Sequence, residues 1–320
     1  MISSPSYRML EPVKTASGVH PWRLACAVSA IGVAAAGCTN APAGTVQAGG
    51  TRPGMTPAAS HAPASPSPRA TTAPPAPPAP HVVVSRLRTA DGALVTVAAF
   101  RGPVQYVLHN GSGDPGAAAA GLVWAGPAVT GAERQRLLAA FNGGFKLSAG
   151  AGGYEQEGHV IATLRTGLAS LVIDRSGQAR IGIWGASVPA PGEAVYSVRQ
   201  NLQPLVYRGQ PTAASPGLWG ATLGGGVSVA RSAVGQDSSG DLLFAGSMAA
   251  TPADLAQALA ARGARIAMEL DINPEWVQLD IARTPGGPLI TAIPGQNRPP
   301  SQFLDGWTRD FFTVLAAPTS

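Results

Sequence analysis

The chain has 320 residues, 45% of them hydrophobic, which is enough to bury a sizeable core. Its formal charge is +5, but the first 80 residues hold five Lys or Arg against one Glu and so account for most of it. The remainder has 17 basic and 16 acidic residues, a balance that argues against nucleic acid as a partner.

Residues 24–36 form an uncharged, largely apolar run. Thirteen residues are too few for a membrane-spanning helix but suit the hydrophobic region of a signal peptide, so we expect export. Small residues lead into Cys38, which resembles a bacterial lipoprotein signal over residues 1–38 that would lipidate Cys38 and anchor the chain to the outer face of the cell membrane. An uncleaved signal anchor and ordinary secretion are the alternatives. The other cysteine, Cys26, lies inside the run, so the folded part is expected to lack disulfides and thiol nucleophiles.

Residues 39–80 contain 11 of the 30 prolines and almost no large apolar side chain. Such a segment buries too little surface to offset the entropy lost on ordering, so we expect a disordered linker with polyproline II character. The folded domain is then expected to cover residues 81–320, held away from a membrane or wall by this linker.

The first part of that domain is predicted to be a strand meander followed by a helix. Thr130 can cap a helix that has Glu133 at its N3 position and runs to Phe141. Before it, three short alternating runs separated by glycine-containing turns are typical of antiparallel strands; they cover residues 82–87, 94–100 and 104–108.

Residues 142–146, Asn-Gly-Gly-Phe-Lys, have two interpretations. One glycine would be sufficient to end the preceding helix as a C-cap. Two glycines also give the backbone unusual freedom and leave room for a ligand beside Asn142 and Lys146. The sequence leaves a structural cap and a binding site equally open here.

Further strand pairs are expected in the middle of the domain, and polar residues accompany them. Arg231 lies within one strand, where an arginine is commonly a snorkelling surface residue; its functional use would be as a forked donor to phosphate or carboxylate. Asn201 lies in a polar stretch that leads into another apolar run. The expected pairs are 168–173 with 179–184 and 227–235 with 242–245, each joined by an Asp/Ser/Gly turn.

The clearest helix in the sequence begins after Thr251, with proline at its first position, Asp254 at N3 and Gly263 just past its end. It joins a strand near residue 242 to a strand at 266–271. If these two strands are parallel in one sheet, the second ends where sites of α/β folds commonly open. The expected fold class is α+β: a single domain of mixed, mostly antiparallel sheet with a few helices.

Residues 266–271 alternate apolar and other side chains, so one face is expected in the core while Glu269 and Asp271 share the other. Two residues of strand rise place their backbones roughly 6–7 Å apart. At that separation the two carboxylates can reach one small substrate and each can raise the pKa of the other. The alternative interpretation is a solvated strand edge with ordinary surface acids.

Sequence motifs for other kinds of catalytic or cofactor site are absent or weak. The histidines lack metal-ligand spacing, and the chain has no nucleophile elbow, P-loop or dinucleotide fingerprint, so we predict no cofactor, with a divalent cation left open. The remaining carboxylates, amides and arginine suit hydrolysis of a glycosyl or phosphate ester. One carboxylic acid would protonate the leaving oxygen, and a second carboxylate would activate water or attack the anomeric carbon.

The order of several short motifs resembles the phosphodiester glycosidase family over most of residues 81–315. The resemblance implies an α+β hydrolase domain that cleaves between a sugar's anomeric carbon and a phosphodiester. It also implies that Asn142, Arg231 and Asp271 are site residues, with Arg231 holding the phosphate. The motifs are Asn142 to Phe145, Gly153-Tyr154 followed by Gly158, Arg231 to Gly235 before an Asp/Gly turn, a Leu/Ala-rich helix, and a strand ending in Leu270-Asp271.

We therefore predict an exported, lipid-anchored hydrolase that acts on a glycan or glycosyl phosphate. Where members of the family continue the aspartate into a glycine-rich turn, this chain has the bulkier segment 272–276, Ile-Asn-Pro-Glu-Trp, which adds an acid. The acid/base candidates are Glu269, Asp271 and Glu275; the predicted substrate-binding residues are Asn142, Lys146, Asn201, Arg231 and Asn273.

Two other functions stay open. A non-catalytic surface lipoprotein could use the same cleft to bind a cell-wall or capsule glycan, with Trp276 as a sugar platform beside the carboxylates. A scaffold whose proline-rich linker, residues 39–80, makes the contacts is the third possibility.

Overall fold

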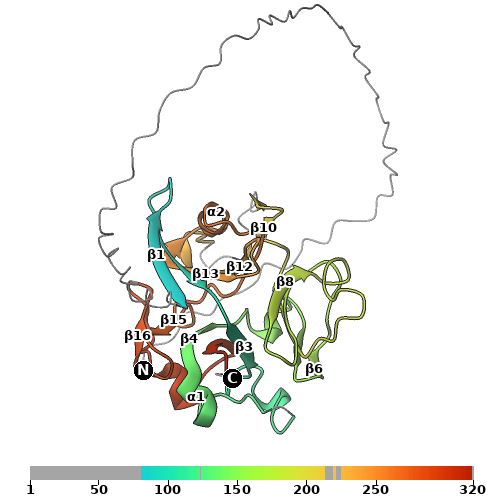
Figure 1. The fold of residues 1–320 in the computed structure, drawn as a ribbon. Helices are drawn as coiled ribbons and strands as arrows, with labels where there is room; N and C mark the ends of the chain where they lie inside the picture. The colour runs from blue at the N-terminus through green and yellow to red at the C-terminus, as the bar shows by residue number, and fades with distance from the viewer. Residues whose placement is uncertain (1–80, 123, 213–218, 221–224, 319–320) are drawn as a thin grey trace, which may run out of the picture. The chain divides into compact units, whose positions relative to one another are not determined.

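Antiparallel β-sheet dominates the computed structural model, which describes residues 81–122, 124–212, 219–220 and 225–318 (Figure 1). The expected signal at 1–38 with Cys38 and the expected linker at 39–80 lie outside the described residues. In the described part of the chain, no helix is long and apolar enough to cross a membrane.

The largest sheet has seven strands, and every neighbouring pair in it is antiparallel. Its first two strands form the expected hairpin. The strands, in spatial order, are β1 (Val82–Arg88), β2 (Leu94–Phe100), β13 (Leu242–Ala250), β12 (Val229–Gln236), β14 (Ile266–Glu269), β10 (Val206–Tyr207) and β11 (Gln210–Pro211).

Helix α2 (Pro252–Ala261) connects β13 to β14. Both strands are antiparallel to β12, which lies between them, so they run parallel to one another. The Thr251 hydroxyl accepts a hydrogen bond from the Asp254 amide (3.1 Å), and the Asp254 carboxylate accepts one from the Thr251 amide (2.8 Å), which completes a capping box. The predicted strand–helix–strand unit is therefore confirmed.

Two five-stranded sheets complete the fold, again with antiparallel neighbours. The first contains β16 (Leu289–Thr291), β15 (Leu279–Ala282), β4 (Leu137–Asn142), β17 (Phe311–Ala316) and β3 (Val104–His109), in that order. The second contains β6 (His159–Ala162), β5 (Tyr154–Gln156), β9 (Ser197–Gln200), β7 (Ala169–Ile173) and β8 (Ala179–Ile183). The short helices are α1 (Gly131–Arg136), α3 (Gln302–Asp305) and the 3₁₀ turns at Gly116–Ala118 and Leu147–Ala149.

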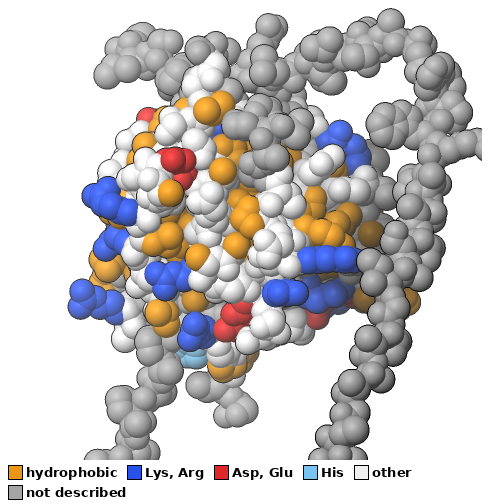
Figure 2. Space-filling model, turned by 90° about the horizontal axis from the view of Figure 1, so that it is seen from above, with side chains coloured by type: hydrophobic (Ala, Val, Ile, Leu, Met, Phe, Trp, Pro, Cys, Tyr) orange, Lys and Arg blue, Asp and Glu red, His pale blue; other side chains and the backbone are white. Residues whose placement is uncertain are grey.

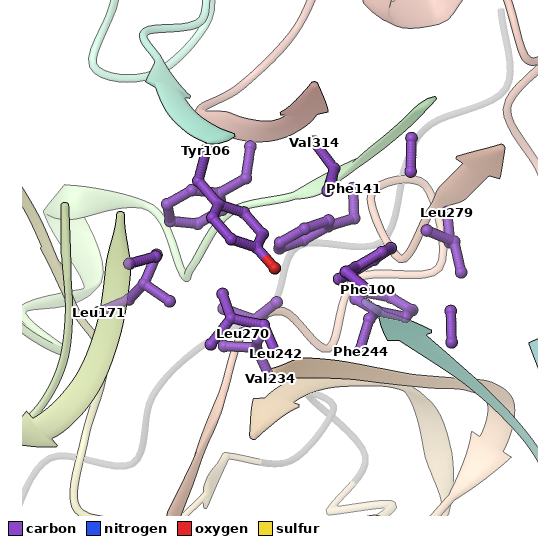
Figure 3. Packing of buried hydrophobic residues seen from close by; sticks show 14 of the residues in the cluster. Phe100, Tyr106, Phe141, Leu171, Val234, Leu242, Phe244, Leu270, Leu279 and Val314 are labelled. Atoms are coloured by element: carbon purple, nitrogen blue, oxygen red, sulfur yellow. The ribbon is translucent and has the colours of Figure 1, made fainter. Parts of the chain in front are cut away.

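The seven-stranded sheet is covered on both faces. Side chains of α2 such as Leu255 and Leu259 pack on one face, where the helix lies over β13 and β12 in Figure 1. On the other face, aromatic side chains of the seven-stranded sheet meet those of the β4 sheet: Phe141 packs 5.7 Å from Phe100 and 5.3 Å from Phe244, centroid to centroid (Figure 3). The hydrophobic core therefore lies between the seven-stranded sheet and the β4 sheet and holds them together.

Two predicted elements are wrong. The expected meander ends after two strands, because β3 leaves the seven-stranded sheet and pairs with β17. The expected helix from Thr130 to Phe141 stops at Arg136, and residues 137–142 form β4. All six residues of β4 are buried between β15 and β17, so sheet pairing on both edges outweighs the local helix signal.

The fold class is therefore mostly β, with an antiparallel sheet as predicted and a smaller helical share than an α+β class suggests. On the face drawn in Figure 2, the described Lys and Arg side chains lie dispersed among acidic, polar and hydrophobic ones.

Candidate active site

The polar centre of the molecule lies where strands from all three sheets end. Asp271 follows β14, Asn142 ends β4, and Arg309 with Asp310 precede β17. Because Phe311 is paired with Asn142 across β17 and β4, the residues just beyond each strand end lie side by side. The third sheet contributes Arg199 from β9.

Asp271 is held on both carboxylate oxygens. Its Oδ1 accepts hydrogen bonds from the amides of Ile272 (2.7 Å) and Asn273 (2.9 Å), and its Oδ2 lies 2.5 Å from Nη1 of Arg309. Burial raises the pKa of Asp271, an effect that the Arg309 charge and the two amides partly offset. Such a carboxylate is fixed in direction and more basic than an exposed aspartate.

Arg309 is the cation of this pair, and it is only 5% exposed. Its Nη2 donates to the Gly144 carbonyl (3.2 Å), and its Cζ lies 5.6 Å from the ring centre of Trp276. Its Nε is buried and has no hydrogen-bond partner among the described residues. A buried donor without an acceptor is costly, so this N–H is suited to an oxygen of a bound anion.

Behind Asp271, Arg231 and Glu269 form a second ion pair, with 2.5 Å between Nη1 and Oε1 and both side chains fully buried. The other N–H groups of Arg231 donate to backbone carbonyls of Trp219, Gly220, Val227 and Ala250 at 2.8–3.1 Å. These contacts occupy every N–H of the guanidinium. The phosphate contact predicted for Arg231 would require one of them to open.

Glu269 has a pKa raised to about 8, because burial penalises its charge and the nearby Asp271 adds to that effect, while Arg231 opposes it. The second oxygen, Oε2, has no hydrogen-bond partner among the described residues.

The predicted alternation of residues 266–271 is confirmed, since Met268 and Leu270 lie in one core cluster and Ala267 in the other. The face of Glu269 and Asp271 is nevertheless buried and not a solvated edge.

Arg199 and Asp310 form a third buried ion pair (2.7 Å), and it explains the two glycines after Asn142. A Cβ added at Gly143 would lie 2.0 Å from Oδ2 of Asp310, and one at Gly144 would lie 2.9 Å from Cζ of Arg199. The absent side chains thus make room for a protein ion pair. Since residues 137–142 are a strand, the helix C-cap interpretation is wrong.

Two predicted amides organise the backbone around the carboxylates. Asn142 donates to Ser232 Oγ (2.8 Å), which in turn accepts a hydrogen bond from the Asp271 amide (3.2 Å). Asn201 donates to the carbonyls of Glu269 (2.8 Å) and Leu270 (2.9 Å). Both side chains are buried, so they position the strand end that carries Asp271.

The other predicted residues lie nearer to solvent. Glu275 pairs with Arg298 at 3.0 Å and its side chain is 34% exposed. Asn273 accepts a hydrogen bond from the Glu275 amide (3.0 Å) and so shapes the turn after Asp271. Lys146 is exposed. The structure therefore brings Asn142, Asn201, Arg231 and Glu269 around Asp271.

Sequence reasoning missed Arg309, Asp310 and Arg199. The available signal was the segment Trp-Thr-Arg-Asp directly before the apolar strand at 311, because charged residues at a strand entry often face a site.

Among the described residues, no group of three or more His, Cys, Asp or Glu side chains is placed to hold a metal ion.

A separate buried acid gives a stability prediction. Asp280 is fully buried, accepts hydrogen bonds from Gln278 (2.5 Å) and Gln296 (2.9 Å), and has a pKa raised by burial to about 6. A carboxyl whose folded-state pKa is raised contributes stability at low pH and loses it as the pH rises through that value. The free energy of unfolding should therefore fall by about 2–3 kcal/mol between pH 4 and 7 on account of this group.

Asp280→Asn should remove this pH dependence. Urea unfolding of both proteins at several pH values compares the slopes, so any constant cost of the amide drops out. Equal slopes in the parent and the variant would contradict the prediction.

Comparison with known proteins supports part of this picture. Residues 135–271 match the phosphodiester glycosidase family, so the predicted resemblance is confirmed over that segment, which includes Asn142 and Asp271. Arg309 and the segment 272–276 lie beyond the matched residues. No curated protein matches the chain.

Two solved structures align with much of this chain. The catalytic domain of zebrafish N-acetylglucosamine-1-phosphodiester alpha-N-acetylglucosaminidase, auto-inhibited by its pro-peptide, is 16% identical, with a TM-score of 0.48; the alignment covers 74% of this chain and 82% of that one. A hypothetical protein from Synechocystis is 14% identical, with a TM-score of 0.42, and the alignment covers 73% of this chain and 62% of that one.

Proposed function

We propose that this chain, whose residues 135–271 match the phosphodiester glycosidase family, hydrolyses the bond between a sugar's anomeric carbon and a phosphodiester. The observation that carries the proposal is the Asp271–Arg309 pair at the strand ends. It sets a fixed carboxylate beside a guanidinium that keeps a free buried N–H.

Arg309 would bind the phosphate. Its Nε lacks a protein acceptor, and a guanidinium donates well to phosphate oxygens. Its positive charge would balance the charge that builds up on the phosphate as the glycosidic bond breaks. This assigns to Arg309 the role that the family resemblance suggested for Arg231.

Asp271 would act at the anomeric carbon. Water attacks that carbon, the bond to the phosphate oxygen breaks, and a carboxylate accepts the proton released by water. The raised pKa of Asp271 makes it a better base, and its negative charge favours the positive charge that develops on the sugar. Glu275, at the edge of the site, is the second acid/base candidate, while Glu269 would support Asp271 from behind.

The products test the proposal. Purified protein incubated with methyl N-acetylglucosamine-1-phosphate in ¹⁸O water should yield free sugar that contains the label and unlabelled methyl phosphate. Methanol with sugar-1-phosphate would indicate cleavage at phosphorus and would overturn the proposed reaction.

Glycan binding without hydrolysis is the second candidate function. The tryptophan and acid in segment 272–276 favour it, because an indole beside carboxylates suits a sugar. Binding of an oligosaccharide with no product in the same assay would support it.

The proposed place of action is the outer face of the cell membrane. If Cys38 is lipidated, the wild-type chain should incorporate radiolabelled palmitate and sediment with membranes, because two or more acyl chains anchor a protein stably. Cys38→Ala should abolish both. Cys26→Ala is the matched control and should change neither; unchanged labelling in Cys38→Ala would exclude the anchor.

A further inference from the structure

Three side chains form an aromatic and basic cluster on the solvent side of Asp271, in which the two indole planes are tilted by 47°; we call it the tryptophan platform: Trp276, Arg298 and Trp307. The two indole rings lie 5.8 Å apart, centroid to centroid. The Arg298 guanidinium lies 5.3 Å from the ring centre of Trp276 and 5.0 Å from that of Trp307. Trp307 is 58% exposed, so much of this ring faces solvent.

The platform is held in place by an ion pair. Arg298 lies 3.0 Å from Oε2 of Glu275, and its Nε also donates to the Glu275 carbonyl (3.3 Å). Asn297 donates to the other carboxylate oxygen (3.3 Å). An exposed indole braced in this way loses little freedom when a ligand stacks on it, which favours binding.

The platform adjoins the site. Trp276 contacts both Arg298 and Arg309, whose Cζ atoms are 5.3 Å and 5.6 Å from its ring centre. Trp307 and Arg309 are two residues apart on one segment, and Arg309 is only 5% exposed. This segment therefore leads from the buried Asp271–Arg309 pair to open solvent within three residues.

The chemistry of the platform suits a pyranose ring. The C–H face of a sugar packs on an indole. Beside the indole rings, the Glu275 carboxylate can accept hydrogen bonds from sugar hydroxyls and the Arg298 guanidinium can donate hydrogen bonds to them. The contacts run from Asp271 to Arg309, from Arg309 to Trp276 and from Trp276 to Trp307. We therefore infer that a ring stacked on Trp307 is not the ring whose anomeric carbon meets Asp271.

We propose that Trp307 is a specificity-determining residue that binds a second sugar ring of the substrate, with Trp276 and Arg298 as positioning residues. This inference rests on the proposed function. The second ring could belong to the glycosyl part or to the alcohol part of the diester, because both lead away from the phosphate at Arg309.

Three probes distinguish these sources. The first is methyl N-acetylglucosamine-1-phosphate, with one ring. The second is the methyl ester of chitobiose-1-phosphate, with the extra ring on the glycosyl side, and the third joins N-acetylglucosamine-1-phosphate to the 6-hydroxyl of methyl glucoside. With the parent protein, one of the two-ring probes should have a KM roughly tenfold lower than the one-ring probe, as about 1.4 kcal/mol of stacking gives.

Trp307→Ala should remove that tenfold advantage and leave kcat and the one-ring probe unchanged, while Trp307→Phe should restore part of it. Trp124→Ala is the matched control, because Trp124 is 94% exposed and its described hydrogen bond, to Glu157, uses only the backbone amide. An advantage that persists in Trp307→Ala, or no two-ring advantage in the parent, would overturn the proposal.

Calorimetric binding of the same probes separates this proposal from the hydrolytic one. If no probe is hydrolysed but the parent binds one two-ring probe about tenfold more tightly than the one-ring probe, the proposed reaction fails and the platform stands. Loss of the difference in Trp307→Ala supports the platform in either case, and equal binding of all three probes to the parent overturns it.

Discussion

Asp271→Asn is expected to lower the release of sugar from a sugar-1-phosphodiester by about 10³-fold, the range that a single acid/base group supplies. Asparagine keeps the shape of the side chain and its acceptor for the amides of Ile272 and Asn273. It removes the negative charge that faces Arg309 and, with it, the base that we propose takes the proton from water. The measurement is kcat for methyl N-acetylglucosamine-1-phosphate.

Asp174→Asn is the matched control. Its Oδ1 also accepts two backbone amides, those of Ser176 (2.8 Å) and Gln178 (3.0 Å), but it lies in the turn between β7 and β8. This variant should retain full activity. Near-native circular dichroism with unchanged turnover in Asp271→Asn would remove Asp271 from the mechanism.

Arg231→Met is expected to lower the free energy of unfolding by about 3–5 kcal/mol, the usual cost of breaking a buried ion pair from one side. The change leaves Glu269 buried without its cation and deprives the carbonyls of Trp219 and Gly220 of their donors. Urea unfolding at pH 9, where Glu269 is ionised, measures the loss through the midpoint and slope. A loss below 1 kcal/mol would mean that the guanidinium contributes little.

At pH 7, where Glu269 is mostly protonated, Glu269→Gln should cost far less, about 1 kcal/mol, because glutamine resembles the neutral acid and Arg231 keeps all its carbonyl partners. The difference in the free energy of unfolding between Glu269→Gln and the parent also depends on pH. The pKa of Glu269 is raised from 4.5 to about 8, so its contribution to stability is present below pH 4.5 and lost as the pH rises to 8. Glutamine does not ionise, so the free energy of unfolding of the variant should rise relative to that of the parent between pH 5 and 8. A difference between the two proteins that stays constant over this range would contradict the prediction.

The parts of the fold that were predicted depend on local signals. The capped helix after Thr251 and the turn at Asp174 are specified within a few residues. Strand β4 was missed, because a continuous apolar run buried on both faces has no strand period. Its neighbours β15 and β17 are more than 130 residues away along the chain, and only their pairing decides its conformation.

The sequence predicted the acids of the candidate site but not the charged residues that pair with them. Alternation placed Glu269 and Asp271 on one face, and the motif order brought Asn142 to them. The partners of these acids could not be deduced from the sequence. Arg309 reaches Asp271 only because β17 pairs with β4 in a particular register, and Arg231 turns inward because carbonyls from several segments converge on it.

Strand β17 has a consequence for biosynthesis. It lies between β4 and β3 inside its sheet, yet it is the last strand of the described chain, and only Asp310 separates it from Arg309. A polypeptide that lacks it leaves the facing edges of β4 and β3 unpaired, and the register that brings Arg309 to Asp271 is lost. The sheet, and with it the placement of Arg309 beside Asp271, therefore depends on residues 311–316, and a polypeptide that stops before them exposes strand edges that are prone to aggregate.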